Sequence, residues 1–123
     1  GTRAAFGLPP GGRQQVRFIR DREGYGIGPH TDGGNKILSL LFYLPRGDED
    51  EDLGTSIFKP ADGGFRCDGE AHHAFEGFRE VWRAPFARNS MFGFARTDRS
   101  FHGLRRIARQ AERDVLLYNV FRR

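Results

Sequence analysis

The chain has 123 residues, the size of a single domain, and a hydrophobic content of 37%. No apolar run reaches the roughly 18 residues that a membrane helix needs. The polar, Gly- and Pro-rich start does not match a signal peptide, so a cytoplasmic protein is expected. The net charge of +4 comes mainly from arginines scattered along the chain, a distribution that disfavours nucleic acid as a partner. Cys67 is the only cysteine, which excludes an internal disulfide.

Glycines and prolines divide the chain into short segments, most of which have the composition of strands. In chain order, we expect strands at residues 16–20, around His30, and at 36–44, 55–59, 78–83, 90–95, 99–104 and 114–121. A helical turn is expected only at 71–78. The acidic run at 48–52 should be an exposed loop, because like charges repel one another in a compact element. About eight short strands predict an all-β sandwich or barrel.

The segment at 36–44 is apolar on both faces. One face would carry Leu38, Leu40, Phe42 and Leu44, and the other Ile37, Ser39, Leu41 and Tyr43. A strand with one solvated face would alternate, so both faces should be covered. Ser39 and Tyr43 mark the face toward the barrel interior. The opposite face should be covered by a helical segment before residue 1 or by a partner subunit in a homodimer. Sedimentation as a well-behaved monomer, without added helices, would contradict this expectation.

The candidate metal ligands are His30, Asp32 and His102. In an extended strand, side chains two residues apart point to the same side, which brings His30 and Asp32 together. His102 lies in a later expected strand and is the natural third ligand. Two histidines and one carboxylate on one face of an octahedron form the triad of non-haem iron(II) oxygenases. A His-x-Asp pair alone is a weak indication, since surface pairs of this kind are common.

Arg113 opens the last expected strand and is a candidate carboxylate anchor. A guanidinium binds a carboxylate through two parallel hydrogen bonds. In triad chemistry that carboxylate would be the distal one of 2-oxoglutarate. The alternative is an arginine exposed at a strand end. Arg105, Arg106 and Arg109 precede the strand and are expected in a loop.

Taken together, these motifs follow one another in an order that resembles the 2-oxoglutarate/Fe(II)-dependent dioxygenase superfamily, in its prolyl-hydroxylase-like branch. The matching parts are Pro-His-Thr-Asp at 29–32, Leu-Phe-Tyr-Leu at 41–44, Leu-Gly-Thr-Ser at 53–56, residues 89–94, His102 and Arg113. The resemblance covers residues 16–121. It departs from the family at 53–56, where relatives often carry a Gly-Gly-Glu-like turn, and in lacking the flanking helices. Residues 1–123 are therefore expected to be one oxygenase core, a piece of a longer chain.

The resemblance implies a double-stranded β-helix, which is a jelly-roll, cupin-like fold. It implies Fe(II) held by the catalytic residues His30, Asp32 and His102, with 2-oxoglutarate bound by Arg113 and Tyr43. The implied reaction is hydroxylation of a small-molecule, sugar or peptide substrate, coupled to oxidative decarboxylation of 2-oxoglutarate to succinate and CO2. The same ligand set also accepts manganese, cobalt or nickel.

Two other functions stay open. A non-catalytic cupin-like barrel would bind a metal or ligand but would not need Arg113 and Tyr43 as a carboxylate anchor. A nucleic-acid demethylase on the same chemistry rests only on the basic charge, and would show strongly salt-dependent binding.

Three further residues near these motifs invite two interpretations. His72 and His73 are adjacent, so in an extended segment they would face opposite ways and could not easily share one site. Tyr25 precedes the His30 motif in a Gly-rich loop. It would either pack on the rim of the barrel or contact a substrate.

Overall fold

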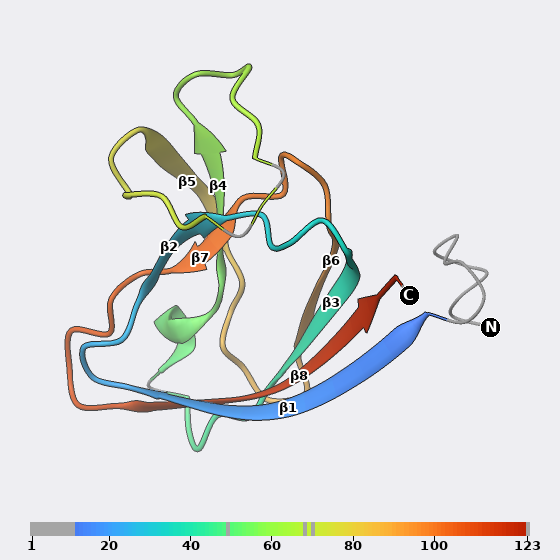
Figure 1. Cartoon of the computed structure of the whole chain (residues 1–123). Helices are drawn as coiled ribbons and strands as arrows, with labels where there is room; N and C mark the ends of the chain where they lie inside the picture. Colours follow the sequence, from blue (N-terminus) through green and yellow to red (C-terminus); the bar gives the residue numbers. More distant parts are fainter. Residues whose placement is uncertain (1–11, 49, 68, 70, 123) are drawn as a thin grey trace.

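The computed structural model describes residues 12–48, 50–67, 69 and 71–122 (Figure 1). Within this part of the chain, eight strands form two antiparallel four-stranded sheets. The first sheet has the order β1 (Arg13–Arg22), β8 (Glu112–Phe121), β3 (Lys36–Tyr43), β6 (Met91–Ala95). The second has the order β2 (Ile27–His30), β7 (His102–Leu104), β4 (Ser56–Pro60), β5 (Phe78–Arg83). The prediction of an all-β chain of about eight strands is confirmed.

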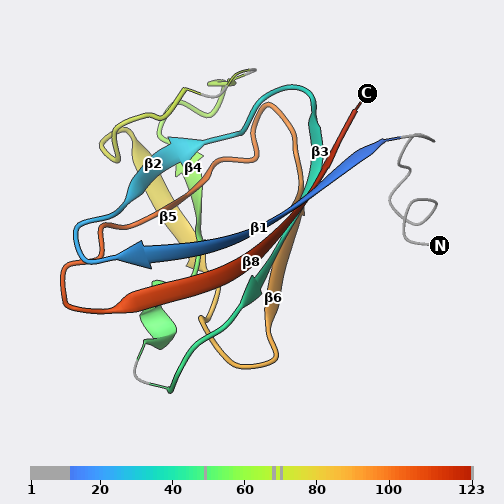
Figure 2. The same ribbon diagram turned by 60° about the horizontal axis from the view of Figure 1, so that its bottom comes forward.

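Each expected strand segment overlaps an observed strand. Where the first or last residue of a strand differs from the prediction, hydrogen-bonded pairing with other parts of the chain accounts for the difference. β5 has the bounds that the sequence predicts. β1 extends well beyond the expected 16–20, because every residue from Arg13 to Arg22 has a partner in β8 (Figure 2). β7 is shorter than 99–104, because the segment before it forms a turn in which the Ser100 amide donates to the Thr97 carbonyl.

The expected helical turn at 71–78 is wrong. This segment is an extended loop that ends in a turn before β5. The loop is tied to the second sheet by the His73 amide, which donates to the Pro29 carbonyl at 2.9 Å. An aromatic cluster gathers residues from the connection between β4 and β5, from these two strands, and from the segment before β7. Its members are Phe58, Phe65, His73, Phe75, Phe78 and Phe101.

In the acidic run, Asp48, Glu51 and Asp52 are exposed, as predicted, Asp50 is half-buried, and residue 49 lies outside the described residues. A short 3-10 helix, η1 (Glu51–Leu53), forms within the run. Arg109 donates to Asp50 at 2.9 Å and to Asp52 at 2.7 Å. The arginine therefore offsets the repulsion that the sequence alone indicates.

The main hydrophobic core lies between the two sheets and is built from both. It comprises Tyr43, Leu53, Ala84, Phe86, Phe92, Leu104, Ile107 and Val115. Burial of this cluster is what fixes the sheets face to face, because apolar area removed from water is the dominant stabilising term in folding. The described residues include no helix long and apolar enough to cross a membrane.

The outer face of the first sheet carries exposed apolar side chains. Pairing places Phe18, Leu116, Phe42 and Met91 in one row across all four strands. Phe18 is 79% exposed and Met91 52%. This row lies on the face that the sequence predicts to need a cover. The cover itself, a helical segment or a partner subunit, stays a prediction.

Candidate metal centre and its pocket

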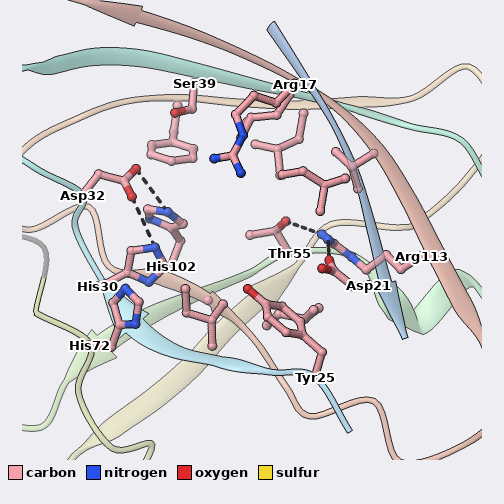
Figure 3. A pocket seen from close by; sticks show the side chains of 18 of the residues that line it. Arg17, Asp21, Tyr25, His30, Asp32, Ser39, Thr55, His72, His102 and Arg113 are labelled. Carbon is pink, nitrogen blue, oxygen red and sulfur yellow. Dashed lines mark hydrogen bonds and ion pairs between the residues drawn. The ribbon is translucent and has the colours of Figure 1, made fainter. Parts of the chain in front are cut away.

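The structure brings His30, Asp32 and His102 together. His30 Nε2 lies 3.2 Å from Asp32 Oδ1, and His102 Nε2 lies 3.4 Å from Asp32 Oδ2. One ligand atom from each of the three residues lies within 4.8 Å of the others. All three side chains are largely buried, with 9%, 13% and 11% exposed. The convergence that the sequence predicts is therefore present (Figure 3).

Strand pairing and one unusual backbone conformation position these ligands. His30 ends β2 and is the pairing partner of His102 in β7, so the two rings lie side by side with centroids 4.3 Å apart. Asp32 lies beyond the end of the strand, with a φ of 70°. Aspartate is among the few side chains that tolerate this left-handed region. The carboxylate thus reaches the histidines through a turn, and not through the strand alternation that the sequence argument assumes.

Backbone hydrogen bonds fix which nitrogen of each ring faces the site. The Nδ1 atoms of His30 and His102 each lie 2.9 Å from a carbonyl oxygen, that of Gly28 and that of Ser100. A carbonyl only accepts, so each Nδ1 carries a proton. In the neutral rings this leaves the Nε2 lone pairs directed at the Asp32 carboxylate. Acceptors that face one another in this way suit a cation between them, which is the arrangement of metal-binding histidines in general.

Electrostatics keep these groups in the forms that bind a metal. Burial is the strongest influence on the Asp32 carboxyl and favours its neutral form. The neighbouring His30 side chain, together with His102 and Lys36, outweighs it and holds the Asp32 pKa well below its ordinary value. Burial lowers the pKa of His102 to about 4, against the opposing effect of Asp32. Near neutral pH the site therefore presents an ionised carboxylate and a neutral His102 imidazole.

The ligand spacing fits a first-row divalent metal. Bonds of about 2.1 Å place two ligand atoms roughly 3.0 Å apart at a right angle and roughly 3.4 Å apart at a tetrahedral angle. The observed 3.2 and 3.4 Å lie in this range. These two distances do not distinguish an octahedral face from three corners of a tetrahedron.

The turn that carries Asp32 is held from outside the site. Arg96, just after β6, donates to the Asp32 carbonyl at 3.2 Å and to the Cys67 carbonyl at 3.3 Å. The Thr31 hydroxyl donates to the Cys67 carbonyl at 3.0 Å, and Thr31 is fully buried. Arg96 and Thr31 therefore position the carboxylate without contacting the ligand atoms.

A cavity of about 330 Å³ opens beside the candidate metal ligands. Its lining comes from both sheets: β1, β3, β6 and β8 of the first, and β2 and β7 of the second. Ser39 and Leu41 line it, which confirms that their face of β3 points inward. His30, Asp32 and His102 share this lining with Arg113.

Arg113 is buried in the cavity wall, only 5% exposed. Its Nη1 donates to Asp21 at 2.9 Å and its Nη2 to the Thr55 hydroxyl at 3.0 Å. Its Nε donates to the Leu53 carbonyl. Burial raises the pKa of the Asp21 carboxyl, although Arg113 opposes this. Arg113 is therefore not the solvated strand-end arginine of the alternative interpretation, and it carries an internal counter-ion that the sequence does not indicate.

Tyr43 lies behind this anchor and not in the cavity lining. Its hydroxyl donates to the Thr55 hydroxyl at 2.9 Å and accepts from the Thr55 amide at 3.0 Å. The Arg113 guanidinium lies 5.6 Å from the centre of its ring. The hydroxyl that faces the cavity beside Arg113 is that of Thr55. Direct binding of 2-oxoglutarate by Tyr43 stays a prediction, and the structure gives its hydroxyl another partner.

The two adjacent histidines face opposite ways, as predicted. The His72 ring lies 4.7 Å from that of His30 and lines the cavity. His73 packs against Phe65 and Phe78 in the aromatic cluster. Tyr25 also lines the cavity and is 44% exposed, so it lies on the rim and within reach of a bound molecule.

Sequence reasoning did not assign four charged or polar residues to the cavity lining: Arg17, Asp21, Lys36 and Thr55. Arg17, Ile19 and Asp21 alternate along β1, so the period of two does indicate one common face. The weak strand character around residues 13–22 conceals it. Lys36 follows Asp32 by four residues and lies 3.3 Å from its carboxylate, a contact set by the turn between β2 and β3.

The comparisons with known proteins add no family. No family model matches the chain, and no curated protein matches it. Membership of the dioxygenase superfamily therefore stays a prediction from the motifs.

Proposed function

We propose that the chain is the core of an Fe(II)- and 2-oxoglutarate-dependent oxygenase that hydroxylates its substrate. The observation that carries this proposal is the lining of one cavity. It contains two histidines and a carboxylate at ligand spacing, and also a buried arginine. A site that only held a structural metal would have no use for a buried cation facing the same cavity.

The order of the strands supports a double-stranded β-helix. From β1 to β8 the chain passes between the two sheets at every step except from β4 to β5, which are paired neighbours. In each sheet an early strand lies beside a late one, β1 with β8 and β2 with β7. Jelly rolls are double sheets of eight antiparallel strands with long connections of this kind. In such a fold the metal ligands would lie at one end of the sandwich, on β2 and β7.

Fe(II) would be held by His30, Asp32 and His102, on the evidence of their spacing, charge and the orientation of both Nε2 atoms. When bound, the metal would activate dioxygen as the oxidant, and 2-oxoglutarate would be oxidised to succinate and CO2 as the substrate is hydroxylated. The chain's own residues hold three ligand positions on one side and leave the other side facing the cavity. Gly28 and Ser100 hold the Nδ1 protons, so both rings keep their orientation.

Arg113 and Thr55 would receive the distal carboxylate of 2-oxoglutarate. Both groups are buried, and both face the cavity. A guanidinium held by Leu53 and Thr55 has little freedom left to lose when it binds a carboxylate. Asp21 shares this guanidinium, so the incoming carboxylate must compete with an internal one.

Replacing Asp21 by asparagine is therefore expected to strengthen 2-oxoglutarate binding by about tenfold, because the change removes a like charge next to the ligand carboxylate. Burial already disfavours the ionised form of Asp21, so the variant should fold. Anaerobic titration calorimetry of the iron-loaded protein measures the effect. Asp62→Asn, in an exposed loop outside the cavity, is the control and should bind like the wild type. Weaker binding by Asp21→Asn would mean that Asp21 orients Arg113 for the ligand.

The most direct test of the proposed reaction follows the fate of 2-oxoglutarate. Purified protein with Fe(II), 2-oxoglutarate, ascorbate and oxygen should form succinate slowly even without a substrate. His102→Ala should form none, and Glu76→Ala, an exposed side chain outside the cavity, should match the wild type. No succinate from folded, iron-loaded wild-type protein would count against an oxygenase.

A non-catalytic cupin-like barrel is the second candidate, and two observations favour it. The Arg113 guanidinium already has a counter-ion in Asp21. The ligand spacing also suits a tetrahedral metal such as zinc. Tight zinc binding with no affinity for 2-oxoglutarate would identify this function.

A further inference from the structure

Among the described residues, Arg17 is the cation of the cavity that has no acidic partner. Among the residues described, the cavity is lined by three cationic side chains, Arg17, Lys36 and Arg113, and by two carboxylates, Asp21 and Asp32. Lys36 lies 3.3 Å from Asp32, and Arg113 lies 2.9 Å from Asp21. In the described part of the chain, no hydrogen bond or ion pair joins the Arg17 guanidinium to another residue.

Strand pairing explains why this guanidinium has no partner within the described part of the two sheets. Arg17 shares the inward face of β1 with Ile19 and Asp21. The residue paired with it in β8 is Leu117, and the residue beyond that in β3 is Leu41. Both of these side chains are apolar and line the same cavity. Figure 3 shows the Arg17 guanidinium turned into the pocket, with the metal-ligand group and the Arg113–Asp21 pair around it.

Arg17 is exposed to solvent. Its charge is therefore stable without a partner, and a ligand can reach it. Arg17 is an exposed residue on the edge strand of the first sheet, so water solvates its charge before a ligand arrives. An ionised group that was buried without a partner would instead be strongly destabilising. Binding an oxyanion here displaces that water, which is unfavourable. A charge-assisted, two-point hydrogen bond next to a low-dielectric wall offsets this loss of solvation.

The charges of the loaded site leave this cation available. Fe(II) would add two positive charges and 2-oxoglutarate two negative charges, so the two cofactors cancel. The excess of one cationic side chain in the lining then remains. The cavity of about 330 Å³ is at the lower end of the range for a site that holds one small molecule, so beside the cosubstrate it leaves room only for a small part of the substrate.

We propose that Arg17 binds an oxyanion group, a carboxylate or a phosphate, of the molecule that this oxygenase hydroxylates. The inference rests on the proposed function for the identity of that molecule as a substrate. It narrows the expected small-molecule, sugar or peptide substrates to anionic ones. Lys36 is less suited to this role, because it already contacts the Asp32 carboxylate, and Arg113 is assigned to the cosubstrate in the proposed function.

The test observes the Arg17 guanidinium directly. The protein is loaded with diamagnetic Zn(II) and saturated with 2-oxoglutarate. Acetate or methyl phosphate is then added while the arginine Nε–H resonances are followed by NMR. Arg17→Lys identifies the Arg17 resonance by its loss. We expect this resonance to shift saturably with one or both anions. The two separate titrations distinguish a carboxylate site from a phosphate site.

Matched variants measure the contribution of Arg17 to anion affinity. With cavity resonances as the readout, Arg17→Gln should weaken binding of the effective anion by at least about tenfold. Arg79→Gln removes one positive charge from an exposed arginine outside the cavity, and should leave the affinity unchanged. Arg17→Gln should also leave 2-oxoglutarate affinity unchanged, because Arg113 is the cosubstrate anchor.

Three results would overturn the inference. The first is the absence of any shift up to about 0.1 M anion, where added salt screens charge interactions. The second is equal anion affinity in wild type and Arg17→Gln. The third is saturation of the Arg17 resonance by 2-oxoglutarate itself, which would make Arg17 part of the cosubstrate site. A failure of the oxygenase proposal has a different signature, namely no 2-oxoglutarate binding, while anions still shift the Arg17 resonance in the zinc protein.

Discussion

Asp32→Ala is expected to abolish iron-dependent succinate formation and to lower the affinity for divalent metal by at least about a hundredfold. Asp32 supplies the single negative charge of the ligand group, and it contacts both histidines. Its removal leaves two neutral imidazoles, which hold a hard divalent cation weakly. Metal affinity is measured by competition with a chromophoric chelator, and turnover by succinate formation.

The backbone at this position calls for a second variant. Asp32 has a φ of 70°, a conformation that alanine adopts only with strain. Asp32→Gly removes the carboxylate at a residue that enters this region freely, so a loss shared by both variants belongs to the ligand and not to misfolding. Full activity in either variant would remove Asp32 from the metal site.

Gly54→Ala is expected to destabilise the fold by at least about 3 kcal/mol, a large fraction of the margin of an ordinary domain. A Cβ at Gly54 would lie 1.5 Å from the Ala84 carbonyl oxygen, which is backbone and cannot swing away. The carbonyl of the next residue, Thr55, accepts a hydrogen bond from the Ala84 amide at 2.9 Å, and the Thr55 hydroxyl accepts one from Arg113. The substitution should therefore lower the urea midpoint and disturb the carboxylate anchor together.

Gly63→Ala is the matched control for this steric effect. A Cβ there would meet nothing within 4 Å, so the unfolding free energy should change by less than about 0.5 kcal/mol. Equal stability of the Gly54 and Gly63 variants would contradict the close packing of Gly54 against Ala84.

Local patterns in the sequence were sufficient to locate the strands and the candidate metal ligands, although Asp32 reaches the histidines through a turn. Turn residues and β-branched or aromatic runs located all eight strands, and the His-x-Asp spacing with a later histidine located the ligand group. The ends of β1 depend on its partner β8, far away in sequence, so composition did not reveal them. The loop at 71–78 lacks helix because His73 bonds to the Pro29 carbonyl, which is also a long-range contact.

Local patterns in the sequence could not predict which side chains meet inside the cavity. Asp21 meets Arg113 across two paired strands, and Thr55 comes from the segment that leads into the other sheet. The orientation of Tyr43 toward Thr55 depends on the same contacts. Such contacts form only when the two sheets pack together. Residues with no local signal in the sequence can therefore line the cavity.

Visible absorption under anaerobic conditions measures whether one cavity holds iron and 2-oxoglutarate together. Wild-type protein loaded with Fe(II) should develop the weak metal-to-ligand charge-transfer band of the 2-oxoglutarate chelate. His102→Ala should lack the band, and Arg113→Ala should need a higher 2-oxoglutarate concentration to reach it. The absence of a band from folded, iron-loaded wild-type protein would contradict the binding of iron and 2-oxoglutarate in one cavity. It would indicate a metal-binding barrel without oxygenase activity.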